Sequence, residues 1–441
     1  MLADQRNRRI VASASFGVFQ RFVQVACTLL LMPIVLRTLG AARFGVWGAA
    51  ASLAWTIALV DIGTGSALVT LVARSIARSH VDEARSQITG ALAIGSCISA
   101  LSLVLTSIAW LGGAYQGSAA PYLIAISGLA LNVPLSAANN VWMALQKGYI
   151  ANFWELMQTV ATTAGLIYAT RFTDDVRVYV AVVYAGLVVA HLGSLIHLFL
   201  LHPELRPRGL PESTASIREV AGSGILFFIV GVAGGLAFFL DNVLALQLLG
   251  PEASARMTIA MRICMTAIGL IVVLSQPLWP AFANAAHMSD RGWIRRNLLR
   301  ATALLVGTTA AGSSIFILYG EPLLRLWLHA NLGIGRPLLW AISAWVVTQA
   351  LVRVPILLLN GLSLIRFQIG VLSVMTLVAV VLKFVLAPYL GVAGILWGTS
   401  IAVLFIAFPA SIWRIHRWAD QSARQENLAA EQFGAEGIEL R

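Results

Sequence analysis

The sequence predicts an all-α integral membrane protein with about twelve transmembrane helices. Of its 441 residues, 59% are hydrophobic and only 11% are charged, whereas a soluble domain contains about 25% charged residues. The apolar runs approach the ~20 residues that a helix needs to cross a bilayer. They lack the alternating pattern of barrel strands. Because backbone amides cannot bond to water inside a bilayer, such runs must form helices.

The first apolar segment follows Arg6, Arg8 and Arg9. It is too long for the core of a signal peptide, so it is predicted to be an uncleaved first span. In chain order, the predicted spans are 11–36, 45–71, 88–112, 121–145, 152–170, 178–201, 223–248, 257–283, 300–320, 337–360, 367–387 and 391–413.

Basic residues distinguish the two sides of the membrane. The net charge is +11, from 30 Lys and Arg against 19 Asp and Glu. Most loop arginines fall in every second connection, which predicts that the N-terminus and the C-terminus are both cytoplasmic. Nucleic acid is excluded as a partner, because no basic run is interleaved with surface aromatic residues.

The longest polar break, residues 202–219, contains three prolines and separates six predicted spans from six. We therefore predict an N-terminal six-helix bundle at 1–205, a cytoplasmic linker at 206–220, a C-terminal six-helix bundle at 221–415 and a cytoplasmic tail at 416–441. Leu39-Gly40 in the first half matches Leu249-Gly250 in the second. Such matches suggest a parallel repeat about an axis along the membrane normal.

Ionisable residues inside predicted spans are costly and tend to mark transport pathways. Arg21 lies near the middle of the first span, in a polar stripe with Gly17 and Gln24. This stripe indicates either a surface that attracts anions or a structural ion pair. Arg262 lies in the eighth span, nearer its outer end. Arg353 lies in the tenth span, where it either lines the transport pathway or extends its side chain to the membrane surface.

Lys383 lies close to the end of the eleventh span, next to Pro388 and Tyr389. A lysine at such a position is more often an anchor at the membrane interface than a ligand. We therefore expect Lys383 to reach the interface.

The acidic residues in the spans have two explanations each. Glu155 lies near the inner end of the fifth span, where it either carries a proton or a cation or pairs with Lys147. Asp61 and Asp241 lie next to glycine-rich stretches, and each either couples to an ion or forms a salt bridge with an arginine.

Asn139 belongs to a neutral polar face of the fourth span, together with Asn132 and Ser136. Such a face binds sugar hydroxyls or joins helices through hydrogen bonds. The chain contains no P-loop and no histidine or carboxylate cluster with metal-ligand spacing. We therefore expect no catalytic residues, no metal and no cofactor.

A resemblance to a known protein family rests on residues 39–47 and 61–68 in the first half and on residues 249–252 and 277–282 in the second. At these positions the sequence resembles the Wzx-type oligosaccharide flippases of the polysaccharide transporter group. This group belongs to the multidrug/oligosaccharidyl-lipid/polysaccharide exporter superfamily. The resemblance implies two six-helix bundles around a central cavity and transport by alternating access. It also implies that an undecaprenyl-pyrophosphate-linked oligosaccharide moves from the cytoplasmic to the periplasmic leaflet of the bacterial inner membrane, coupled to H⁺ or Na⁺.

A flippase of this kind serves the biosynthesis of lipopolysaccharide or exopolysaccharide, with membrane lipids and other polysaccharide assembly proteins as partners. A buried pyrophosphate requires fixed positive charge, which the planar guanidinium of Arg supplies well. Our hypothesis assigns substrate binding to Arg21, Gln24, Asn139, Arg262 and Arg353, and ion coupling to Asp61, Glu155 and Asp241. The alternatives are a multidrug or metabolite exporter of the same superfamily, and a membrane polysaccharide polymerase or glycosyltransferase.

Overall fold

The computed structural model describes residues 2–53, 64–113, 119–209, 240–275, 278–288, 290–362 and 364–421. All regular elements in this part of the chain are helices. Nine of the described helices are long and apolar enough to cross a membrane. The predicted all-α membrane fold is confirmed.

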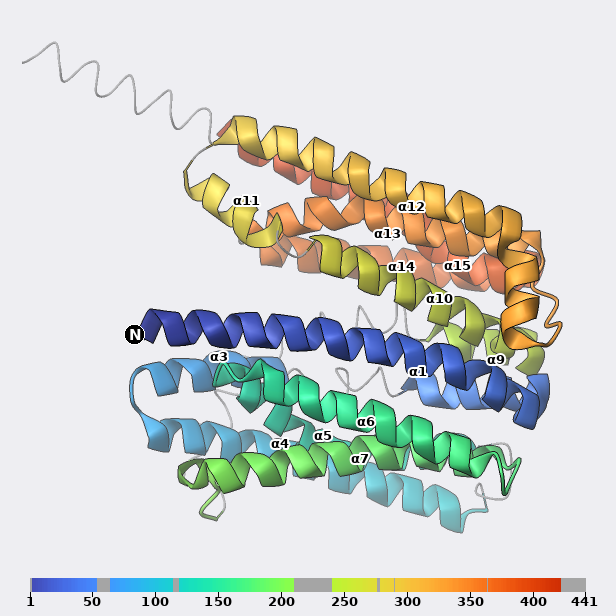
Figure 1. Ribbon diagram of the computed structural model, residues 1–441, viewed down its shortest axis with the longest axis horizontal. Coiled ribbons are helices and arrows are strands. Elements are labelled where there is room, and N and C mark those ends of the chain that lie inside the picture. Colours follow the sequence, from blue (N-terminus) through green and yellow to red (C-terminus); the bar gives the residue numbers. More distant parts are fainter. Residues whose placement is uncertain are drawn as a thin grey trace, which may run out of the picture. The chain divides into compact units, whose positions relative to one another are not determined.

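The chain forms two compact units (Figure 1). The first comprises Met1–Ile263, Glu321–Gly335 and Ala387–Val392, and the second comprises Cys264–Gly320, Arg336–Leu386 and Ala393–Arg441. Most of the predicted linker falls within 210–239, which lies outside the described residues. The predicted bundle boundaries therefore remain a prediction.

The first helix, α1 (Leu2–Ser52), bends at Gly40, where φ is 70° and ψ is 166°. A side chain at this backbone conformation would be strained, which explains a glycine here. The part before Gly40 contains the first predicted span, and the part after it begins the second. The remainder of the second span, including Asp61, falls within 54–63, outside the described residues.

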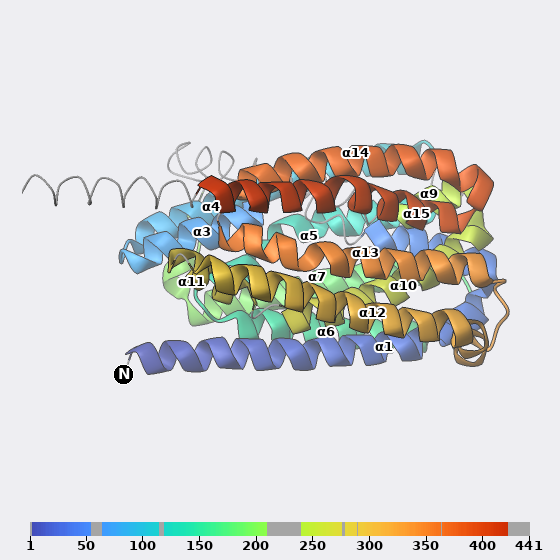
Figure 2. The same ribbon diagram turned by 90° about the horizontal axis from the view of Figure 1, so that it is seen from above.

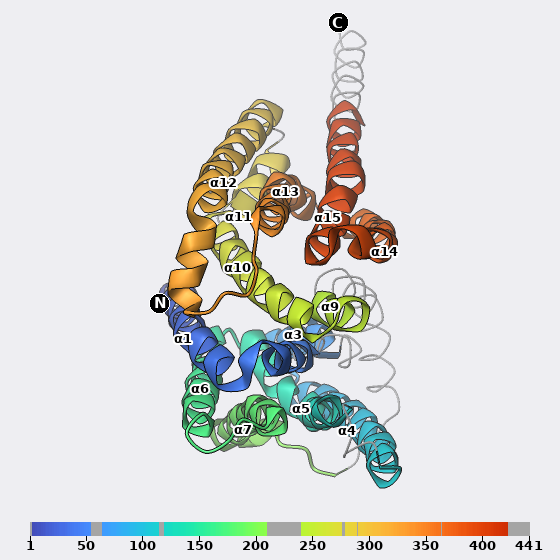
Figure 3. The ribbon, with the colours of Figure 1, turned by 90° about the vertical axis from the view of Figure 1, so that its right-hand side faces the viewer.

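In the described part of the chain up to residue 209, five further helices and one 3-10 helix follow α1. They are α3 (Thr64–Ala77), α4 (Val81–Leu111), α5 (Ala120–Ala144), α6 (Gly148–Ala169), α7 (Val176–Leu201) and the short 3-10 helix η3 (Pro203–Leu205). Helices α4, α5, α6 and α7 correspond to the predicted spans 88–112, 121–145, 152–170 and 178–201. Helix α5 packs against α4 and α7, and α6 packs against α1 and α7, as the end-on view in Figure 3 shows. Glycines permit close approach: a Cβ at Gly128 of α5 would lie 2.5 Å from the Cβ of Tyr184 on α7.

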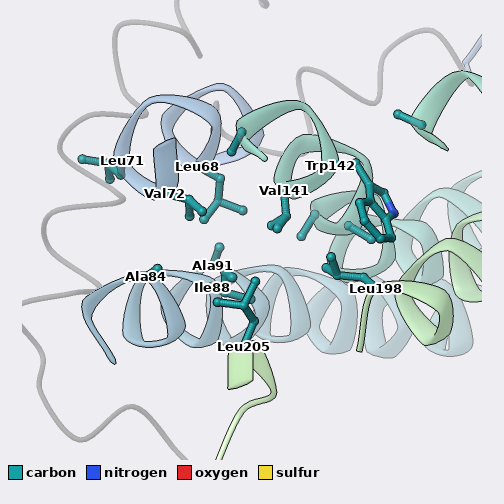
Figure 4. Close-up of a cluster of buried hydrophobic side chains, with 14 of the residues drawn as sticks. Leu68, Leu71, Val72, Ala84, Ile88, Ala91, Val141, Trp142, Leu198 and Leu205 are labelled. Atoms are coloured by element: carbon teal, nitrogen blue, oxygen red, sulfur yellow. The ribbon is translucent and has the colours of Figure 1, made fainter. Parts of the chain in front are cut away.

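Apolar side chains from α3, α4, α5 and α7 form a buried cluster at one end of this unit (Figure 4). Trp142 of α5 is fully buried in it, beside Leu198 of α7. Leu205 of η3 adds a further buried side chain. The chain that leaves α7 is thus fixed to the core by its first residues.

A second glycine break separates α9 (Asp241–Leu249) from α10 (Pro251–Ser275). Gly250 has φ 89° and ψ 177°, close to the conformation of Gly40. Just beyond the two breaks, the hydroxyl of Ser254 donates to the backbone carbonyl oxygens of Gly45, at 2.9 Å, and of Asn242, at 3.1 Å. These bonds join the second part of α1 to α9 and α10.

The second unit contains the end of α10 and the remaining helices. They are α11 (Leu278–His287), most of α12 (Arg291–Leu328), α13 (Arg336–Gly361), most of α14 (Ile365–Leu390) and most of α15 (Val392–Ala402). A π-helical turn, Val403–Ala407, follows α15, and the helix then continues to Gln421. Helix α11 packs against α13, and α14 and α15 run side by side (Figure 2).

The position of Lys383 differs from the prediction. We expected a side chain that reaches the membrane interface, but Lys383 is fully buried in α14. Helix α15 approaches it closely, because a Cβ at Gly398 would lie 2.8 Å from the backbone nitrogen of Lys383. The sequence pattern places Lys383 near a helix end, but it cannot show which face of the helix a neighbour covers.

Candidate substrate and ion site

Polar side chains of α1 and α6 meet in the first unit, where the sequence predicts two membrane spans. Gln20 Nε2 donates to Glu155 Oε2 at 3.2 Å, and Arg21 Nη1 donates to Gln24 Oε1 at 2.9 Å. A Cβ at Gly17 would lie 3.0 Å from Asn152 Nδ2, so the absence of a side chain there lets the helices approach. We call Gln20, Arg21, Gln24, Asn152 and Glu155 the α1–α6 polar cluster.

Helical spacing explains why these residues converge. Gly17, Gln20 and Gln24 are three and four positions apart, so they share one face of α1. Asn152 and Glu155 are likewise three positions apart on α6. Gln20 was not among our predicted site residues, although its spacing from Gly17 and Gln24 could have indicated it.

The cluster holds two opposite charges on an accessible surface. Arg21 and Glu155 are both exposed, while Gln20 between them is buried. The positive charge of Arg21 interacts electrostatically with the carboxylate of Glu155. A guanidinium carries five N–H donors, and the hydrogen bond to Gln24 occupies one of them. Arg21 therefore retains donors for an anion.

Glu155 does not take Lys147 as its partner, which was the alternative explanation for this acid. Lys147 Nζ lies instead 2.8 Å from His202 Nε2, and 5.7 Å from the ring centroid of Trp142. Lys147 thus belongs to the end of the unit where α7 leads into η3. The side chain of Glu155 interacts with Gln20 and Arg21.

Asn139 lies in the contact between α5 and α7. The hydroxyl of Ser194 donates to Asn139 Oδ1 at 2.7 Å, and His191 Nδ1 lies 2.6 Å from Asn132 Oδ1 on the same pair of helices. Both contacts join helices through hydrogen bonds, the second of the two roles that the sequence allowed. The structure does not bring Asn139 into the α1–α6 polar cluster.

Arg262 lies at the middle of α10, half-buried, one turn beyond Thr258. The prediction that it lies nearer the outer end of its span is wrong, because the helix begins at Pro251, immediately after the break at Gly250. A Cβ at Gly48 would lie 2.0 Å from Thr258 Oγ1. Arg262 therefore follows a point at which α10 is tightly packed on α1.

The two remaining predicted residues in the described chain occupy different units. Asp241 is fully buried in the first turn of α9, where the helix dipole stabilises a negative charge. Arg353 is half-buried in the second unit, and its Nε donates to the hydroxyl of Ser275 at 3.0 Å. Of all the predicted site residues, the structure brings together Arg21, Gln24 and Glu155. In the part of the chain that the structure describes, no group of three His, Cys, Asp or Glu is arranged to hold a metal ion.

Residues 16–286 match the model of a protein family described as polysaccharide biosynthesis protein. A multidrug resistance MATE family transporter of the MOP superfamily, solved in an inward-facing conformation, has a TM-score of 0.72 at 15% identity, over 92% of this chain and 98% of that chain. An outward-facing form has a TM-score of 0.65 at 16% identity, over 93% and 96%. No curated protein matches the chain.

A third solved structure is a MOP superfamily transporter from Pyrococcus furiosus, described as having a binding pocket of reverse polarity that suggests a different function. It has a TM-score of 0.66 at 15% identity and covers 93% of this chain and 96% of that chain. At these identities the similarity concerns the fold.

Proposed function

Because the chain belongs to the polysaccharide biosynthesis protein family, we propose that it is a flippase for an undecaprenyl-pyrophosphate-linked oligosaccharide. The substrate moves from the cytoplasmic to the periplasmic leaflet of the bacterial inner membrane, for the biosynthesis of a surface polysaccharide. The fold shared with MOP superfamily exporters supports transport by alternating access. The distribution of loop arginines supports cytoplasmic termini.

The α1–α6 polar cluster is the observation that carries this proposal. Arg21 is exposed within a span, and its guanidinium has donors beyond the one that bonds to Gln24. Planar guanidinium groups bind phosphate oxygens through two parallel hydrogen bonds, and these charge-assisted bonds are about twice as strong as neutral ones. Arg21 therefore suits a pyrophosphate headgroup, with Gln24 fixing the orientation of its side chain.

Glu155 makes the affinity for the headgroup depend on ion binding in this proposal. An anionic headgroup and the carboxylate of Glu155 compete for the charge of Arg21, since both are attracted to it. When a proton or a sodium ion neutralises Glu155, the competition ends and the headgroup binds more tightly. Coupling free energies of this kind are typically about 1–3 kcal/mol, or roughly 5–150-fold in affinity.

The other candidate residues have supporting roles in this proposal. Arg262 and Arg353 contribute further positive charge along the path of the headgroup, and Asp241 and Asp61 are additional sites for the coupling ion. Asn139 binds a sugar hydroxyl only if its bond to Ser194 opens during transport. These assignments are tested after those of Arg21 and Glu155.

A transport assay tests the proposal. The purified protein is placed in liposomes together with a fluorescent lipid-linked oligosaccharide, and a membrane-impermeant quencher measures the fraction that has crossed. Wild-type protein is expected to accelerate crossing, and Arg21→Ala is expected to slow it at least tenfold. Arg37→Ala is the matched control, since Arg37 is an exposed arginine further along the same helix, and it is expected to transport normally.

The same liposomes separate the alternatives. A multidrug exporter would move a soluble organic cation and leave the lipid-linked oligosaccharide in place. A polymerase or glycosyltransferase would lengthen or modify the oligosaccharide, which mass spectrometry detects. Normal crossing with Arg21→Ala at equal protein levels would contradict the role of the cluster.

A further inference from the structure

An exposed stripe of side chains on α14, in the second unit, begins at an arginine. Its apolar members Val374, Leu377, Val381 and Val385 are all more than half exposed. Their spacing of three and four residues places them on one helix face. Arg366 is exposed on the same face, two turns before Val374.

The length of this stripe fits the membrane. Arg366 and Val385 are 19 positions apart, which corresponds to about 28 Å of helix. The hydrocarbon core of a bilayer is about 30 Å thick. When the apolar stripe lies in the hydrocarbon, Arg366 therefore lies at the level of the lipid headgroups.

A second stripe follows the helix that continues from α15 to Gln421. Phe405 is 71% exposed and Trp413 is 49% exposed, and Arg417 is exposed one turn further on. Intervals of four or eight residues place these side chains on nearly the same face. This stripe also ends at an arginine.

Aromatic contacts hold the two arginine-bearing ends together. The ring centroids of Phe367 and Trp413 lie 6.2 Å apart in a tilted contact. The guanidinium carbon of Arg417 lies 4.4 Å from the ring centroid of Trp413. Tryptophan prefers the membrane–water interface, and stacking on its ring orients a guanidinium. Figure 2 shows α14 and α15 side by side.

At this end of the second unit, three arginines lie close together in the sequence or in the structure. Among the described residues, Arg366, Arg414 and Arg417 form no ion pair with a carboxylate. Two exposed arginines elsewhere are paired, Arg325 with Glu321 and Arg177 with Asp175. We call Arg366, Phe367, Trp413, Arg414 and Arg417 the arginine–tryptophan patch.

We propose that the arginine–tryptophan patch binds the phosphate headgroup of an anionic phospholipid of the surrounding membrane. Arginine binds phosphate through paired hydrogen bonds, and basic residues near a membrane surface attract anionic lipids. The two apolar stripes leading away from the patch accommodate the acyl chains. The continuity of charge and apolar surface favours a lipid over a soluble phosphate, which would engage the arginines alone.

Native mass spectrometry of the full-length protein tests this site, with phosphatidylglycerol and phosphatidylcholine as probes. Wild-type protein is expected to retain phosphatidylglycerol preferentially. The variant Arg366→Gln/Arg417→Gln is expected to lose about 25-fold in affinity for it, or about fivefold for each arginine. The control Arg177→Gln/Arg325→Gln removes two paired arginines elsewhere and is expected to retain the preference. Equal thermal stability of both variants shows that folding is not the cause.

Three outcomes would overturn the proposal. Equal retention of phosphatidylcholine by wild-type protein would mean that the apolar stripes bind lipid regardless of the charge of its headgroup. Displacement of phosphatidylglycerol by inorganic diphosphate would identify a soluble-phosphate site. Displacement by undecaprenyl diphosphate at far lower concentration than by other lipids would identify a site for the transported lipid instead.

Discussion

Replacing Gly45 by alanine is expected to separate α1 from α10. A Cβ at this position would lie 1.9 Å from the carbonyl oxygen of Pro251 and 2.9 Å from the nitrogen of Ala255. Both are backbone atoms, so no side-chain rotation can relieve the clash. The helices would have to move apart by at least about 1 Å, in a region where helices are closely packed.

The expected loss of stability follows from two contributions. Overpacking of a closely packed site usually costs about 1–3 kcal/mol. The buried hydrogen bond from Ser254 to the carbonyl oxygen of Gly45, 2.9 Å long, would also be strained or lost, at about 1 kcal/mol. Together these amount to about 3 kcal/mol. Since 1 kcal/mol shifts the Tm of a large domain by about 2–4 °C, we expect a fall of about 6 °C or more.

Thermal unfolding in detergent, followed by tryptophan fluorescence, measures this effect. Gly307→Ala is the matched control, because a Cβ at Gly307 meets no atom within 4 Å. In the exposed middle of α12, alanine is expected to be neutral or to stabilise by up to about 1 kcal/mol. If Gly45→Ala unfolded at the wild-type temperature, the contact between α1 and α10 would be wrong.

Three further predictions concern stability. Asp175 caps α7, and the hydrogen bond from Arg177 holds the pKa of Asp175 below its usual range. The charge of Asp175 therefore stabilises the fold above about pH 4. This contribution is lost as the pH falls through the folded-state pKa. Asp175→Asn keeps a capping side chain but removes its charge, so it is expected to lower stability at pH 7 by about 0.3–1 kcal/mol and to flatten the acid side of a Tm–pH curve; an unchanged curve would contradict this. Asn132→Ala is expected to lower the free energy of unfolding by about 1–3 kcal/mol, because it removes the acceptor beside buried His191. In a double-mutant cycle, replacing both residues by apolar ones is expected to cost less stability than the sum of the two single changes. Gly40→Ala is expected to cost about 1 kcal/mol because φ is 70° there, and equal unfolding temperatures would argue against the bend.

Hydrophobic run length was sufficient to predict most of the fold. The spans at 88–112, 121–145 and 178–201 correspond to α4, α5 and α7 within a few residues, because a bilayer requires about 20 apolar residues in each helix. The interruption near Gly40 was predicted, because the spans 11–36 and 45–71 leave a gap there, but the structure has a bend within α1 in place of a loop. The start of α10 was placed six residues too late, because its first turns contain the polar residues Glu252, Ser254 and Arg256, and this shifted Arg262 along its helix.

The candidate site was predictable only in part. Arg21 and Glu155 were identified because charges inside spans are rare, but their mutual contact depends on how α1 packs on α6. Gln20 was missed because the prediction started from charged residues, although its spacing from Gly17 and Gln24 places it on the same helix face. Lys383 was misjudged because burial depends on Gly398 of a neighbouring helix, which no local pattern reveals.

The most direct test of the central claim is the affinity for undecaprenyl diphosphate as a function of pH. It is measured by titration of the purified protein, for the wild type, Glu155→Gln and Arg21→Ala. We expect wild-type affinity to rise as Glu155 takes up a proton, Glu155→Gln to bind tightly at every pH, and Arg21→Ala to bind weakly throughout. The account would be contradicted if Glu155→Gln showed the same pH dependence as the wild type, or if Arg21→Ala bound equally well.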